Sequence, residues 1–149
     1  MTARRTLMLD RLDDVMADVD RLLGGHVTVG NWSLGQICNH LAWALRASVE
    51  GAPIRSPWLI RATIGPLIKG SFLRRGRMPT GVRLRGMAGP RPGLDARAEA
   101  EALRASIAYY RAHPGPRVAH PIFGRLSPEE WDRFHCIHCA HHLSFAVPA

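Results

Sequence analysis

Four stretches of the chain carry apolar residues at steps of three and four, which is the period of an amphipathic α-helix. They predict helices near residues 3–24, 33–50, 95–112 and 127–146. No alternating strand pattern persists between them, and the sequence shows no internal repeat. We therefore predict an all-α fold, a four-helix bundle with essentially no sheet.

Residue types at the predicted helix starts support this assignment. Ser33 with Gln36, and Ser127 with Glu130, have the spacing of a capping box. Asp95 is a favourable N-cap for the third helix. Residues 54–94 are rich in Gly and Pro and weakly periodic, so they predict a long crossover between the second and third helices, with a short helix within residues 57–73.

The length of 149 residues predicts a single domain over residues 1–149. The longest apolar stretch, residues 57–68, is interrupted by Arg61, Gly65 and Pro66 and falls short of the roughly 20 residues that cross a bilayer. We expect no membrane span, no membrane partner and no signal peptide. An odd number of cysteines, three, argues against a disulfide framework. These features predict a cytoplasmic protein.

The net charge of +8 is unevenly distributed, because no acidic residue lies between Glu50 and Asp95. The basic residues of this 55–91 segment are Arg55, Arg61, Lys69, Arg74, Arg75, Arg77, Arg83, Arg85 and Arg91. The segment is either a solvated basic loop or a surface for an anionic partner. Few aromatic residues interleave with the charges, so we expect no specific nucleic-acid binding.

Half of the eight histidines fall within the fourth predicted helix, at positions 135, 138, 141 and 142. At about 100° per residue, His138 and His142 lie about 40° apart and His135 lies about 60° from His138, all on the core-facing side. A buried imidazole needs partners for its nitrogens, and several close together cannot all be protonated. A divalent metal ion satisfies both conditions, and His138 with His142 has the spacing of a chelating pair.

The third ligand should come from a facing helix. His40 lies at the edge of the apolar face of the second helix, one turn after Gln36, and is the best candidate. His26, His113 and His120 lie in turn-like segments and are poorer candidates. The predicted metal ligands are therefore His40, His138 and His142. Gln36, His135 and His141 are predicted to orient these ligands or to handle protons.

Cys136 and Cys139 form a Cys-x-x-Cys pair that suggests other chemistry. Haem attachment requires His directly after the second cysteine, where Ala140 stands. A structural zinc site would need two further ligands, and Cys38 is the one remaining thiol. We interpret the cysteines as small apolar residues, with a redox role of Cys139 as the alternative.

The motifs resemble those of a bacterial domain-of-unknown-function family within the DinB-like superfamily of metalloenzymes, and the resemblance covers nearly the whole chain. They are Trp32-Ser33-Leu34-Gly35-Gln36 with Asn39-His40-Leu41, His120-Pro121-Ile122-Phe123-Gly124-Arg125-Leu126-Ser127 with Glu130-Trp131, and His138-Cys139-Ala140-His141-His142-Leu143. The resemblance implies a four-helix bundle, often dimeric, with a long crossover.

The same resemblance implies a metal triad on His40, His138 and His142, holding zinc or nickel. His141 remains the alternative to His142, although helical geometry favours His142, since His141 lies about 100° from it. Relatives in the wider superfamily include transferases and isomerases that use low-molecular-weight thiols. The resemblance therefore implies a homodimer with a small-molecule substrate, such as a thiol.

Three hypotheses follow. The first is a metalloenzyme with thiol-dependent transferase or hydrolase-like chemistry. The second is a non-catalytic, metal-stabilised helical module that binds a partner through the basic 55–91 segment. The third is a plain helical dimer whose histidines are core residues. The sequence offers no catalytic carboxylate, since Glu129, Glu130 and Asp132 belong to the first turn of the fourth helix, so it leaves the reaction open.

Overall fold

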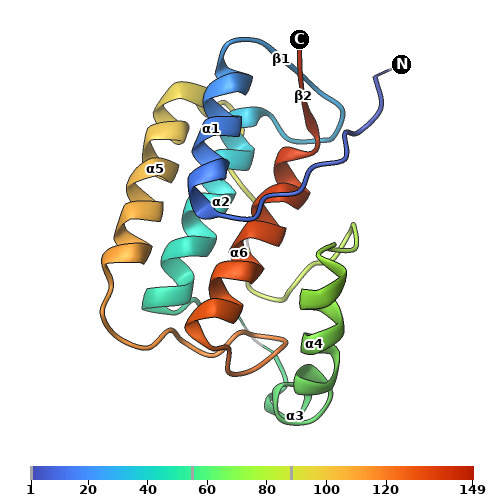
Figure 1. The fold of residues 1–149 in the computed structure, drawn as a ribbon, viewed down its shortest axis with the longest axis vertical. Coiled ribbons are helices and arrows are strands. Elements are labelled where there is room, and N and C mark those ends of the chain that lie inside the picture. Colours follow the sequence, from blue (N-terminus) through green and yellow to red (C-terminus); the bar gives the residue numbers. More distant parts are fainter. Residues whose placement is uncertain (1, 55, 88) are drawn as a thin grey trace.

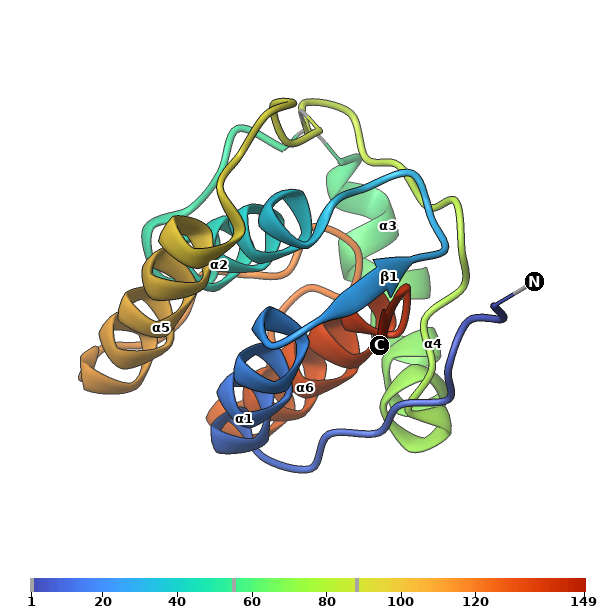
Figure 2. The same cartoon turned by 90° about the horizontal axis from the view of Figure 1, so that it is seen from above.

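A computed structural model describes residues 2–54, 56–87 and 89–149 of the chain, which are mostly helical (Figure 1). The four long helices are α1 (Leu12–Leu23), α2 (Leu34–Glu50), α5 (Ala96–Ala112) and α6 (Pro128–Leu143). α2 packs along α5 and also contacts α6 (Figure 2). α1 contacts the same two helices, α5 and α6. The buried side chains between them form one apolar cluster that includes Val15, Val19, Leu41, Leu45, Leu103, Tyr110 and Leu143.

The helix starts form as their sequences predict. The backbone N–H of Ser33 donates to Gln36 Oε1 at 2.9 Å, and the N–H of Gln36 donates to Ser33 Oγ at 3.2 Å. Ser127 and Glu130 make the same reciprocal pair at 2.9 and 3.1 Å. These bonds satisfy N–H groups that the first turn of a helix leaves without partners. Both predicted capping boxes are confirmed.

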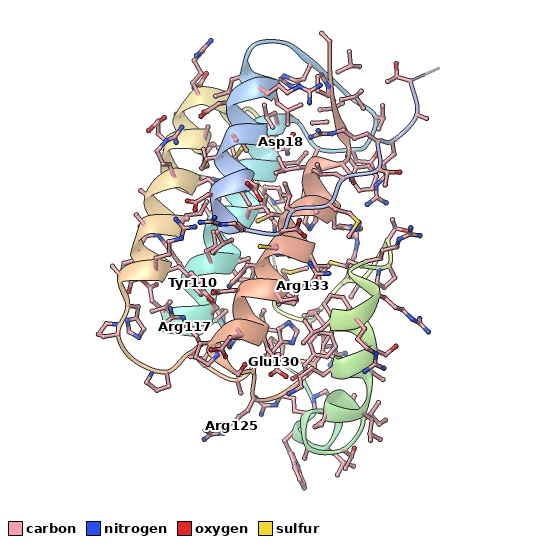
Figure 3. The ribbon with its side chains drawn as sticks, viewed as in Figure 1. Asp18, Tyr110, Arg117, Arg125, Glu130 and Arg133 are labelled. Carbon is pink, nitrogen blue, oxygen red and sulfur yellow. The ribbon has the colours of Figure 1, made fainter. Side chains whose placement is uncertain are left out.

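The first helix begins later than predicted. Residues 2–11 run without helix along the end of α6, and α1 begins at Leu12. The N–H of Arg5 donates to the carbonyl of Ser144 at 3.2 Å, and its guanidinium pairs with Asp18 on α1 (Figure 3). Leu9 is buried in the core. The prediction of a helix from residue 3 is wrong, because tertiary contacts hold this segment extended.

The other end of the chain also differs from the prediction. α6 ends at Leu143, and β2 (Ala146–Pro148) then pairs antiparallel with β1 (His26–Thr28). The expectation of essentially no sheet is therefore wrong at this one place. A strand pair of three residues carries too little periodicity to be recognised from sequence, since each strand finds its partner more than a hundred residues away.

The connection between α2 and α5 contains two helices, α3 (Trp58–Ala62) and α4 (Ile64–Arg75), where one short helix is predicted. α4 lies beside α6 (Figure 1). Gly65 allows the start of α4 to lie against the loop before α6, because a Cβ there would clash with the carbonyl oxygen of Ile122. Among the described residues, none of the helices has both the length and the apolarity needed to cross a membrane.

Candidate metal centre

α2 and α6 bring three histidines together in the interior. His40 lies on α2, and His138 and His142 lie one turn apart on α6. One ring nitrogen from each comes within 4.8 Å of the others, a grouping that could hold a metal ion. His40 and His138 are buried and His142 is half-buried. The predicted convergence of these three side chains is therefore confirmed.

The distances between the nitrogens suit a small divalent ion. His138 Nε2 lies 3.1 Å from His40 Nε2 and 3.1 Å from His142 Nε2. A tetrahedral ion about 2.0–2.1 Å from each nitrogen would hold its ligands about 3.3–3.4 Å apart. Each of these two pairs would have to separate by only a few tenths of an ångström to receive it, and the third pair lies within 4.8 Å. The residues present therefore fit such an ion.

Burial keeps these imidazoles in the neutral form that binds metals. Burial, with the neighbouring His141, lowers the pKa of His40 to about 4. Burial is the main cause that lowers the pKa of His142 to about 2, and the neighbouring His40 is the second cause. The pKa of His138 falls well below its ordinary value, again mainly through burial. Since the free ligand is the deprotonated ring, no proton has to be removed near neutral pH before a metal binds.

The other nitrogen of His138 adds to this argument. Among the described residues, its buried Nδ1 has no hydrogen-bond partner. A neutral ring carries one proton, so Nε2 presents a lone pair when Nδ1 carries it. The single lone pair of His138 Nε2 can accept a hydrogen bond from His40 Nε2 or from His142 Nε2, but not from both. One of these two close contacts is then left without a hydrogen bond. A cation between the three nitrogens would remove that conflict.

Two tryptophans border the three histidines. The Trp32 ring stacks on His142 with centroids 5.2 Å apart and an angle of 9° between the planes, and it also contacts His40 at 5.1 Å. Trp43 lies on the other side of His40 at 5.9 Å. Trp32 directly precedes the capping Ser33, and no role for either tryptophan is predicted above. Trp43 lies three residues after His40, so helical spacing places it beside that ring, whereas the contact of Trp32 with His142 depends on how α2 and α6 pack.

His40 also lines a groove of about 360 Å³. Its lining comes from one face of α2 and from the loop before α5: Asn39, His40, Trp43, Pro53, Gly86, Gly89, Pro90 and Arg91. Asn39 Nδ2 donates to Glu99 Oε2 at 3.0 Å, which fixes that side chain against α5. Of the three histidines, His40 borders the groove, and Arg91 gives the groove a positive charge.

The three companion residues predicted for the ligands occupy different surroundings. Gln36 Nε2 donates to the carbonyl oxygens of Pro90 and Arg91 at 3.4 and 3.2 Å, and so ties the rim of the groove to α2. His135 Nε2 lies 3.0 Å from Ser48 Oγ, away from the triad. His141 Nδ1 accepts from Arg4 Nη2 at 3.1 Å, and its ring centroid lies 4.9 Å from that of His142.

The remaining histidines have other partners. His26 Nδ1 lies 2.8 Å from the Leu22 carbonyl oxygen. His120 is buried, and its Nδ1 accepts from the N–H groups of Ile122 and Phe123, both at 3.1 Å. His113 packs near Gly115 in the turn after α5. None of these three belongs to the group of convergent nitrogens among the described residues.

The cysteines are all buried and free. Burial is the main cause that raises the pKa of the Cys38 thiol to about 12 and that of Cys136 to about 11. The pKa of Cys139 is raised in the same direction, mainly by burial. Because a thiolate is the reactive form, these thiols behave as apolar core groups, as the sequence analysis interprets them.

Comparison with known proteins gives a family without a described activity. The model of one family, described as "Protein of unknown function (DUF1569)", matches residues 1–149. No curated protein and no solved structure matches the chain significantly. The geometry of the site must therefore carry the functional argument.

Proposed function

Because this chain belongs to the DUF1569 family, whose description assigns it no activity, we propose from its geometry that it is a divalent-metal-dependent enzyme. His40, His138 and His142 would hold the ion. The observation that carries the proposal is the convergence of three neutral imidazoles, with Nε2 atoms 3.1 Å apart in two of the three pairs.

The ligand number favours catalysis over a purely structural role. Structural zinc sites usually have four protein ligands, whereas catalytic sites have three and keep one position for water or substrate. Three histidines converge here among the described residues, and His40 borders an open groove. A site closed on all sides would instead bury its three ligands and leave no groove.

We propose zinc or nickel as the ion, since both accept imidazole ligands. A bound ion would lower the pKa of a water molecule or thiol in its open coordination position. This chemistry is compatible with a transferase that uses a low-molecular-weight thiol or with a hydrolase. Trp32 and Trp43 would fix the His142 and His40 rings and exclude bulk water, and Arg91 would attract a negatively charged substrate to the groove.

The proposal includes the wider classification as a DinB-like four-helix bundle with a long crossover. Its support is that α1, α2, α5 and α6 each contact two of the others, while residues 51–95 join α2 to its neighbour α5. We also propose that the protein is cytoplasmic, for which three free thiols are the support, and that it is a homodimer, as the resemblance implies.

The test is elemental analysis of the purified protein, before and after dialysis against a chelator. We expect about one divalent ion per chain, lost in His138→Ala and kept in His113→Ala, whose side chain lies outside the triad. The chelated protein should keep its helical circular dichroism and lose thiol-transfer or ester-hydrolysis activity, which the ion restores.

Two outcomes would redirect the proposal. Unfolding on chelation, with no activity in the loaded protein, would favour the metal-stabilised binding module. A metal-free protein that takes up no ion when zinc or nickel is added would leave the histidines as core residues and reject the enzyme.

A further inference from the structure

The outward side of α3 and α4 carries an exposed apolar surface. It consists of six side chains: Trp58, Leu59, Ile60, Ile64, Leu67 and Ile68. Trp58 is 69% exposed and Leu67 is 80% exposed. Single exposed apolar residues are ordinary, but six of them within residues 58–68 are a concentration typical of a contact surface. We call these six residues the α3–α4 face.

A neighbouring side of α4 is anchored to the rest of the molecule, since Phe72 lies about 40° and Lys69 about 100° from Ile68 around the helix. Lys69 Nζ pairs with Oε2 of Glu130 on α6 at 3.0 Å (Glu130 is labelled in Figure 3). The centroid of the Phe72 ring lies 4.9 Å from that of Phe123 and 6.0 Å from that of Phe134. These contacts fix which side of α4 points inward. The α3–α4 face therefore cannot turn into the core without breaking them.

Positive charge lies at one end of the face, where α4 ends. Ile64, Leu67 and Ile68 have i, i+3, i+4 spacing on α4, and Arg75 continues the same stripe at i+11. Arg74, Arg75 and the following Arg77 are exposed. No acidic residue occurs from residue 51 to residue 94, and Arg55 in this range lies outside the described residues. An apolar surface with a basic border is complementary to an apolar surface with an acidic one.

We propose that the α3–α4 face docks on an anionic phospholipid surface. The apolar side chains would enter the boundary between headgroups and acyl chains, Trp58 would lie at headgroup level, and Arg74 and Arg75 would contact lipid phosphates. The sequence expectation of no membrane partner rested on the lack of a spanning helix. It did not include the exposure of these side chains, which lets the protein lie on a bilayer without crossing it.

A second copy of the chain fits the same face less well. A symmetric interface would place the face against itself. The exposed arginines at its border would then approach those of the partner, with no acidic residue of the same segment to pair with them. An anionic bilayer provides negatively charged phosphates that can pair with these arginines.

The experiment is co-sedimentation with vesicles of phosphatidylcholine alone and of phosphatidylcholine mixed with phosphatidylglycerol. We expect binding to the mixed vesicles only, weakened by added salt. Leu67→Glu should reduce vesicle binding at least roughly tenfold, because a leucine that would enter the bilayer is replaced by a charged side chain. Arg75→Gln should reduce it roughly fivefold. Met8→Glu is the matched control, since Met8 is 66% exposed and lies outside the face.

Circular dichroism shows whether each variant keeps its fold, which is expected because the altered side chains are exposed. The emission of Trp58, assigned by its loss in Trp58→Phe, should shift to the blue on the mixed vesicles. Equal binding by Leu67→Glu and the unaltered chain would overturn the proposal. So would absence of vesicle binding, or a dimer in sedimentation analysis that Leu67→Glu converts to a monomer, because the occupant would then be a second copy.

Discussion

The indole of Trp32 lies parallel to the imidazole of His142, with 5.2 Å between ring centroids and 9° between ring planes. Trp32 immediately precedes the N-cap of α2, whereas His142 occupies the last turn of α6. The stacking thus joins the start of α2 to the end of α6. It restricts the orientation of His142, the most exposed of the three candidate ligands.

Removing this contact tests how much ring orientation contributes to metal binding. Trp32→Ala should lower metal affinity about tenfold or more, the usual effect of removing a group that orients a ligand. Trp32→Phe should retain most of the affinity, because a flat ring remains. Competition with a chelating dye measures both. An affinity unchanged in Trp32→Ala would show that His142 needs no such support.

Replacing the ligands one at a time tests the triad itself. His138→Ala should have the largest effect on metal affinity, since its Nε2 contacts both other ligand nitrogens. His40→Ala and His142→Ala should also lower the affinity sharply, while His26→Ala and His113→Ala should not. Calorimetric titration with zinc is the measurement. A ligand variant that binds as tightly as the unaltered chain would exclude that histidine.

His141 provides a separate test, because it is the alternative to His142. Its Nδ1 is held by Arg4 at 3.1 Å, and the convergent group contains His142 instead. We expect His141→Ala to change zinc affinity several-fold at most. A loss as large as that of His142→Ala in the same titration would move the site to His141.

The buried His120 predicts a loss of stability in acid. Burial lowers its pKa to about 3, against an ordinary value near 6.5. Between these values the unfolded chain binds a proton that the folded chain does not, so the free energy of unfolding falls as pH falls from 6.5 toward 3. The loss is about 1.4 kcal/mol per pH unit for one such histidine.

His120→Asn should remove this contribution, because the asparagine carbonyl can accept from the N–H groups of Ile122 and Phe123 without titrating. Urea unfolding of both proteins between about pH 7 and pH 4, roughly the range over which a histidine titrates, gives the slope of the free energy of unfolding against pH. The variant should show a shallower fall, by about one proton. Equal slopes would mean that His120 is protonated in the folded state.

A hydrogen bond between α5 and α6 should contribute measurably to stability. The Tyr110 hydroxyl donates to Asp132 Oδ1 at 2.6 Å, and Tyr110 is almost fully buried. Tyr110→Phe should cost about 1–2 kcal/mol, since a bond to a charged acceptor is lost while the ring stays. Denaturant unfolding measures the change. Asp132→Asn should cost less, because its side-chain oxygen still accepts; a neutral Tyr110→Phe would contradict the prediction.

The basic 55–91 segment should bind nucleic acid only weakly. Contacts with phosphates release counterions, so any affinity should fall steeply as salt is added. We expect binding that disappears near physiological ionic strength, measured by fluorescence anisotropy with a labelled duplex. Tight binding to a defined sequence that resists salt would instead support the binding module.

Much of the helical framework follows from local sequence. The Ser-x-x-Gln and Ser-x-x-Glu capping boxes fix the starts of α2 and α6, because both partners lie within one turn of the same helix. The i, i+4 spacing of His138 and His142 likewise places them on one face without further information. These relationships are short in sequence, and helical geometry alone determines them. The likeness to the DinB-like superfamily stays a prediction.

Other features depend on contacts between distant segments. Residues 3–11 were predicted to be helical, yet they lie outside α1, where Arg5 contacts Asp18 and Ser144. The strand pair at residues 26–28 and 146–148 joins the segment after α1 to the segment after α6, and so depends on how these two helices pack.

The same holds for the site and for the exposed face. Helical spacing could nominate His40, but its 3.1 Å approach to His138 depends on how α2 packs on α6. The sequence also did not show which apolar residues of 57–68 point inward and which point outward. The contacts of Lys69 and Phe72 with other parts of the chain decide this for α4. The sequence by itself determined which residues share a helix face. Tertiary structure decided which faces meet, because the packing of all the helices, and no single segment, sets their relative position.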